Sequence, residues 1–225
     1  GNLLYGISKL AKISQNDNNQ YTIFNIAYSQ YVKVDFDLTK SFLIDEQNSL
    51  VFHCGFGIGI PYGNSNILPY EKRYFSGGAN SVRGWSVRSL GPGSFVGKDG
   101  KVDFINQTGN VKIDLNLEYR THLFWKLDAA AYIDAGNIWN TRNYEGIDGG
   151  QFKFKTFYKQ IAVSYGVGLR LNFDYFILRF DTGMKAINPA EPTGKLHYPI
   201  TVIPLFILIS AVTLLSILQW DYRSE

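Results

Sequence analysis

Long segments in which apolar and polar residues strictly alternate limit most strongly what this chain can fold into. One side of residues 109–120 is apolar: Val111, Ile113, Leu115, Leu117 and Tyr119. The other side is polar: Lys112, Asp114, Asn116, Glu118 and Arg120. Because successive side chains of a β-strand point to opposite faces, this pattern predicts a strand with one apolar and one polar face.

The same alternation recurs along the chain, in residues 31–39, 49–61, 127–138, 159–171 and 175–185, with a weaker candidate at 2–13. These segments are about twice the usual strand length of roughly 5–6 residues. Short turns alternate with longer loops between them, and outer-membrane barrels show the same asymmetry. The sequence therefore favours an all-β transmembrane barrel with apolar side chains toward lipid, and the alternative is a soluble antiparallel sandwich.

Composition excludes several other classes of protein. A chain of 225 residues suits one domain, and its single cysteine excludes an internal disulfide framework. The net charge of +3 gives no indication of nucleic-acid binding. The three histidines are scattered, and neither a phosphate-binding loop nor a Ser/His/Asp elbow is present, so we expect no metal, no cofactor and no enzymatic activity.

One connection, residues 62–107, is unusually long for a compact domain, and loops of that length are commonly functional. It is rich in aromatic residues, which disordered segments are not. Within it, Gly77 and Gly78 precede the run Ser81-Val82-Arg83-Gly84-Trp85. The glycine pair predicts a tight turn that directs the guanidinium of Arg83. If the loop folds inward, Arg83 requires carboxylate partners, because a guanidinium only donates hydrogen bonds.

Glu118 and Asp134 are the candidate partners. Both fall on the polar faces of neighbouring strands, at similar distances from the turn near 122–126. An inserted guanidinium would relieve their mutual repulsion and could bond both carboxylates. The alternative is that each carboxylate faces a water-filled lumen. An eight-stranded barrel is filled by its own side chains, so a folded loop inside predicts a wider barrel with further strands upstream. The absence of a starting methionine also suggests the later part of a longer protein.

The segment Phe75-Ser76-Gly77-Gly78-Ala79-Asn80-Ser81-Val82-Arg83-Gly84-Trp85 resembles the inserted-loop signature of the BamA/TamA family of outer-membrane assembly factors, the bacterial surface antigens. Trp85 stands where that family usually has Phe or Tyr. Residues 109–120, the strand end Ile133-Asp134-Ala135-Gly136-Asn137-Ile138-Trp139, and residues 166–170 and 178–181 resemble family strands in the same order. The resemblance covers about residues 50–186.

The resemblance implies the C-terminal half of a transmembrane antiparallel barrel, about eight of sixteen strands, with its sixth extracellular loop folded inside. It implies that Arg83, with Gly84 and Trp85, is anchored on Glu118 and Asp134. It implies the outer membrane of a Gram-negative bacterium, and the style of the loop resembles Bacteroides-type versions. The implied partners are outer-membrane lipid, unfolded barrel client proteins, upstream POTRA domains and assembly lipoproteins.

Two functions remain open at this stage. The first is a factor that assembles and inserts outer-membrane proteins. The second is a passive pore, or a two-partner secretion transporter, in which the inner loop acts as a plug. A transporter of that kind would share the Arg-Gly-aromatic loop, so the motif alone does not separate the two.

The end of the chain departs from the family. Residues 1–199 read as the partial barrel, whereas 200–225 form an apolar tail that lacks alternation and is long enough for a transmembrane helix. We expect either an altered reading frame after about His197, the explanation we favour, or a non-alternating closing strand. Aromatic residues at predicted strand ends suit an interfacial girdle or ordinary sheet edges: Phe124, Trp125, Trp139, Tyr158 and Tyr175.

Overall fold

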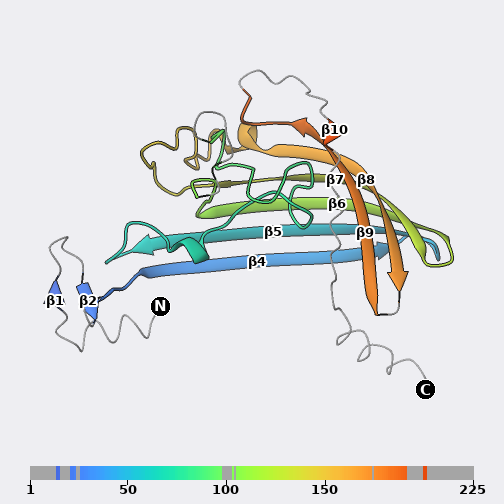
Figure 1. Cartoon of the computed structure of the whole chain (residues 1–225), viewed down its shortest axis with the longest axis horizontal. Coiled ribbons are helices and arrows are strands. Elements are labelled where there is room, and N and C mark those ends of the chain that lie inside the picture. Colours follow the sequence, from blue (N-terminus) through green and yellow to red (C-terminus); the bar gives the residue numbers. More distant parts are fainter. Residues whose placement is uncertain are drawn as a thin grey trace.

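The computed structural model describes residues 14–15, 21–23, 26–97, 103, 105–173, 175–191 and 200–201. Its main feature is one curved antiparallel sheet with the order β10-β9-β8-β7-β6-β5-β4 (Figure 1). The strands are β4 (Gln30–Leu43), β5 (Asn48–Tyr62), β6 (Val111–Phe124), β7 (Leu127–Trp139), β8 (Ala162–Phe173), β9 (Phe176–Ile187) and β10 (Ile200–Thr201). A separate small sheet contains β1 (Ser14–Gln15), β2 (Tyr21–Ile23) and β3 (Ile26–Ala27).

The predicted all-β architecture is confirmed, with differences at the strand ends. Strand β6 continues past residue 120, because its pairing with β7 extends through an irregularity to Phe124 and Leu127. The predicted strand at 159–171 begins only at Ala162, because Phe157–Gln160 forms a short 3₁₀ helix, η3. The candidate strand at 2–13 and the tail from 202 onward lie outside the described residues. Among the residues described, no helix has the length and apolar character needed to cross a membrane.

The two faces of the sheet have opposite chemistry, as the alternation predicts. On the outward face, Val34, Ile133 and Val167 are 54%, 54% and 60% exposed. On the inward face, Asp114 and Asp134 are 1% and 0% exposed. Exposed apolar side chains outside and buried carboxylates inside are the polarity of a barrel wall in lipid, and they do not fit a sandwich with an apolar interior.

The long loop, residues 63–110, supplies the interior that the sheet lacks. It includes a short 3₁₀ helix, η1 (Tyr70–Lys72), and lies against the inward face of the strands (Figure 1). Val82, Trp85 and Leu90 of this loop form a buried apolar cluster with Ala162 of β8. The loop therefore supplies about half of the buried apolar residues of the described chain, and the strands supply the rest.

Glycines on the inward face of β5 explain how the loop approaches so closely. A Cβ placed on Gly57 would lie 2.6 Å from the ring of Tyr74, and one on Gly59 would lie 2.9 Å from Leu68. Both contacts are shorter than real Cβ atoms show, so the loop packs directly on the strand backbone. The run of glycines on this face predicts such an approach.

The loop at 140–161 packs aromatic side chains against the end of β7. Trp139 is fully buried, and its ring makes edge contacts with Phe152 and Phe157 at centroid distances of 5.6 and 6.3 Å. The assignment of Trp139 to an interfacial girdle is therefore wrong. The other four aromatic residues proposed for that girdle are exposed: Phe124, Trp125, Tyr158 and Tyr175.

Candidate functional site

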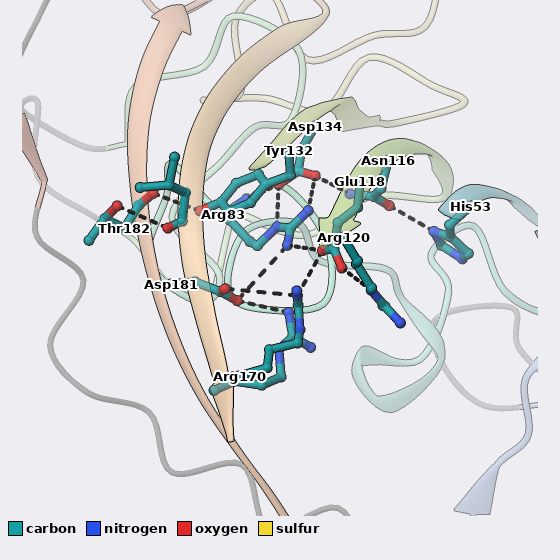
Figure 2. Close-up of polar contacts among 12 residues, drawn as sticks. His53, Arg83, Asn116, Glu118, Arg120, Tyr132, Asp134, Arg170, Asp181 and Thr182 are labelled. Atoms are coloured by element: carbon teal, nitrogen blue, oxygen red, sulfur yellow. Dashed lines mark hydrogen bonds and ion pairs between the residues drawn. The ribbon is translucent and has the colours of Figure 1, made fainter. Parts of the chain in front are cut away.

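The tip of the long loop is a closed turn that presents one arginine. Gly77 and Gly78 have φ angles of +97° and +93°, a region that side chains other than glycine rarely adopt. The Gly78 amide donates to the carbonyl of Trp85 at 2.8 Å, which closes the turn. Arg83 lies inside this closed segment and projects toward the inward face of the sheet (Figure 2).

The structure brings Arg83, Glu118 and Asp134 together. Nε and Nη2 of Arg83 donate to the two carboxylate oxygens of Asp134, each at 2.7 Å, and Nη1 donates to Glu118 Oε2 at 2.7 Å. The backbone amide of Arg83 also donates to Asp134 Oδ2, at 3.1 Å. All three side chains are buried, at 4%, 8% and 0% exposure respectively. This is a bidentate ion pair with a second carboxylate on the remaining arm of the guanidinium (Figure 2).

Strand register explains why both carboxylates reach the same guanidinium. Asp134 lies opposite Asn116, and Glu118 lies opposite Tyr132, so the two acids are diagonal neighbours on β6 and β7. Tyr132 fills the space between them and the loop, because the Arg83 guanidinium lies 3.3 Å from its ring centroid. The Asn116 amide donates to Asp134 Oδ1 at 2.8 Å and orients that carboxylate. Four inward-facing side chains of one hairpin therefore make the receptor for the arginine.

The residues around Arg83 also fit the sheet tightly. A Cβ on Gly183 of β9 would lie 2.5 Å from the backbone oxygen of Arg83, and one on Gly84 would lie 2.7 Å from Ser164 of β8. Trp85 is 4% exposed, and the Lys185 ammonium lies 5.3 Å from its ring centroid. The Arg-Gly-Trp run is thus held by β6 to β9 together.

Two further contacts hold the loop at other points. The Ser81 hydroxyl donates to Asp114 at 2.9 Å, inside the barrel wall. The Tyr74 hydroxyl donates to Asp35 of β4 at 2.6 Å. Burial, followed by the hydrogen bond to Asp35 and its negative charge, raises the pKa of Tyr74 above the ordinary value. Tyr74 therefore remains a hydrogen-bond donor under mildly alkaline conditions.

Sequence reasoning missed the arginines that surround Glu118. Nε of Arg120 donates to Glu118 Oε1 at 2.5 Å, and Nη2 of Arg170 donates to Oε2 at 2.8 Å. Asp181 accepts from Arg179 at 2.8 Å and lies 3.9 Å from Arg83. All of these residues fall on predicted inward faces, which was the available signal. Alternation gives the face of a residue, but it does not show that four arginines meet around three acids.

The arrangement holds the loop through ion pairs and hydrogen bonds to the strands. Within the described residues, no three His, Cys, Asp or Glu side chains gather in a way that would hold a metal ion. The chain has long strands, an apolar outer wall, a polar inner face, and a loop folded inward onto buried carboxylates. Together they define a segment of a transmembrane β-barrel of the outer-membrane type with an anchored internal loop.

Comparison with known proteins gives the family. Residues 11–198 match the Omp85 superfamily domain, so the chain belongs to the Omp85 superfamily. It is 26% identical over 121 residues to the outer membrane protein assembly factor BamA of Neisseria meningitidis serogroup B (strain ATCC BAA-335 / MC58), a match that spans 52% of this chain and 15% of that protein. Family and relatives indicate an outer-membrane β-barrel.

A solved BamA structure shows the same fold. BamA from Haemophilus ducreyi lacking POTRA domains 1–3 aligns with a TM-score of 0.56 and 18% identity, covering 69% of this chain and 32% of that chain. CdiB from Acinetobacter baumannii aligns with a TM-score of 0.45 and 18% identity, covering 76% and 26% respectively. The chain thus spans about a third or less of these larger proteins.

Proposed function

We propose that this chain is the barrel portion of an outer-membrane protein assembly and insertion factor of the BamA/TamA type. The observation that carries the proposal is the 26% identity over 121 residues to the Neisseria assembly factor BamA. The buried anchor of Arg83 on Glu118 and Asp134 supports it by fixing a folded loop inside the barrel, a feature that a transporter would share. The role requires no cofactor and no catalytic residue.

In this proposal the barrel acts by templating a client strand and by disturbing the bilayer at a weak lateral seam. The anchored loop stiffens the wall formed by β6 to β9, so that any weakness is confined to other strands. The partners are outer-membrane lipid, unfolded barrel clients, upstream POTRA domains and assembly lipoproteins. The host is a Gram-negative bacterium, of Bacteroides type by the style of the loop.

The test is Arg83→Ala in the full-length protein, produced as the only copy in its own host. The matched control is Arg142→Ala, which removes an exposed arginine whose nearest described partner is Asn66 at 3.2 Å. We expect the Arg83 variant to lower the amounts of many outer-membrane proteins together, while the control leaves them unchanged. Quantitative proteomics of the outer-membrane fraction measures this.

The competing function is a pore or a two-partner secretion transporter. If Arg83→Ala leaves the general outer-membrane proteome intact but abolishes export of one secreted protein, the transporter reading replaces the assembly reading. Strong ion conductance without any assembly defect would identify a passive pore. If the variant leaves the proteome, export and conductance all unchanged, the anchor has no role in the function of the protein.

A further inference from the structure

A small cavity lies beside the loop anchor, on the lumen side of the sheet. Its volume is about 210 Å³, and it opens between the loop tip and the inward faces of β4, β5, β6 and β9. Its polar lining includes Thr39, His53, Asn80, Arg83, Arg120 and Arg179, with Glu118 as the one acid among the residues lining it. Such a wall is strongly biased toward positive charge.

Glu118 offsets only part of this charge, because its two oxygens are shared among three arginines. Oε1 accepts from Arg120, and Oε2 accepts from Arg83 and Arg170. Arg83 is also matched by Asp134, which is fully buried behind it, and Arg179 is paired with Asp181 at 2.8 Å. The four arginines of this cluster therefore exceed its three acids by one positive charge, and Arg120 is the partly exposed guanidinium on the cavity wall.

The ring of His53 on this wall is held between two hydrogen-bond partners. Its Nδ1 lies 2.7 Å from Asn116 Oδ1, and its Nε2 lies 2.9 Å from Asp37 Oδ2. The amide nitrogen of Asn116 donates to Asp134 and to the Ser81 carbonyl, which leaves its oxygen toward the ring. Both partners of the ring are therefore acceptors, and a charge on the imidazole would be matched by the carboxylate of Asp37 beside it.

Donors around the cavity also lack partners. Arg120 is 43% exposed at its side chain, and within the described residues only its Nε makes a hydrogen bond. Arg170 and Arg179 lie directly opposite each other across β8 and β9, an arrangement that repulsion disfavours. Nη1 of Arg170 and Nε of Arg179 are buried, and no described group accepts a hydrogen bond from either. A buried donor without an acceptor is costly.

From this geometry we propose that the cavity is a binding site for a small soluble oxyanion, with a phosphate group as the best match. Planar guanidinium groups pair with phosphate oxygens through two N–H groups at once, and Arg120 supplies both terminal nitrogens free. Arg179 adds a second guanidinium to the lining beside its ion pair with Asp181, while Thr39 and Asn80 add neutral polar groups. The cavity opens to the lumen and the sheet separates it from the bilayer, so the anion arrives from water rather than as a lipid headgroup.

The test uses the full-length protein purified in detergent. Inorganic phosphate is titrated by isothermal calorimetry at constant ionic strength, with chloride as the replaced ion, and the unfolding temperature is followed in parallel. We expect saturable binding and a rise in unfolding temperature that chloride does not give, because a ligand that binds only the folded state stabilises it. Phosphate that behaves like chloride in the wild-type protein overturns the proposal.

Substitutions locate the site. Arg120→Gln and Arg179→Gln each remove a charge-assisted contact, and we expect phosphate affinity to fall by about tenfold or more in each. Arg142→Gln removes the same charge from an exposed loop and should bind phosphate like the wild type. If the two cavity variants fold and keep wild-type affinity, phosphate binds elsewhere and the proposal is wrong. The proposal is independent of the assembly role, since neither readout measures assembly.

Discussion

Removing the Arg83 side chain would leave two carboxylates inside the barrel wall, and their surroundings differ. Asp134 has no other cationic partner among the described residues and keeps only the Asn116 amide and the backbone amide of residue 83. Glu118 keeps Arg120 and Arg170. Breaking a buried ion pair by removing one partner costs about 3–5 kcal/mol. We therefore expect Arg83→Ala to weaken docking of the loop by about that amount, with most of the cost arising at Asp134.

The hydrogen bonds of Arg83 show how the free-energy cost of removing it divides between Asp134 and Glu118. Arg83 makes two side-chain hydrogen bonds to Asp134 and one to Glu118. Hydrogen bonds to charged groups contribute about 1.5–3 kcal/mol each. In double-mutant cycles, we expect a coupling between Arg83→Ala and Asp134→Asn of about 3 kcal/mol or more, and a coupling with Glu118→Gln of about half that.

Hydrogen exchange of the full-length protein in detergent micelles measures the free energy of loop docking directly, at the amides of residues 76–86. A docking loss of about 3–5 kcal/mol raises the rate of exchange there by roughly two to three and a half orders of magnitude. Urea unfolding of the barrel reports whether the strands themselves are weakened. The reasoning is refuted if exchange of the loop tip is unchanged, or if the coupling to Glu118 equals or exceeds the coupling to Asp134.

Three further perturbations test other contacts of the loop and the sheet. Gly183→Ala would place a Cβ 2.5 Å from the backbone oxygen of Arg83 and should displace the loop tip, whereas Gly55→Ala, whose nearest contact is 3.5 Å, should be tolerated; limited proteolysis of the loop compares them. Tyr74 has a raised pKa, so its stabilising bond is fully present below the unfolded value of 10.0 and is lost as pH rises through the higher folded value. Tyr74→Phe should therefore remove a loss of stability seen only above about pH 10, measured by urea unfolding. Trp139→Ala empties a fully buried site and should cost about 3–5 kcal/mol in the same assay, and a change below 1 kcal/mol would contradict the burial.

Alternation in the sequence predicts the faces of the strands but not their register. Glu118 and Asp134 were predictable as inward neighbours, because both fall on polar faces of one hairpin. That Asp134 lies opposite Asn116 and diagonal to Glu118 depends on the turn, where β6 continues to Phe124. The placement of Tyr132 under the guanidinium follows from that register, so no period-two pattern could have given it.

The loops could be predicted only in part, for a different physical reason. Gly77 and Gly78 signal a turn locally, since positive φ angles favour glycine. The contact between Tyr74 and Asp35 joins residues 39 apart in the chain, and no local signal encodes it. The loop at 140–161 looks polar in sequence, yet Phe152 packs on Trp139 and makes a small apolar cluster there.

The anchor is best understood as a device for specifying one loop conformation rather than for adding stability. A buried ion pair gains little over an apolar replacement of equal size, because desolvation offsets the attraction. Here the apolar cluster of Val82, Trp85 and Leu90 already supplies burial. Apolar burial is non-directional, whereas the bidentate pair on Asp134 is satisfied in one position only. The arginine therefore acts with the close glycine contacts and with the hydrogen bonds of Tyr74 and Ser81 to give the buried loop one register.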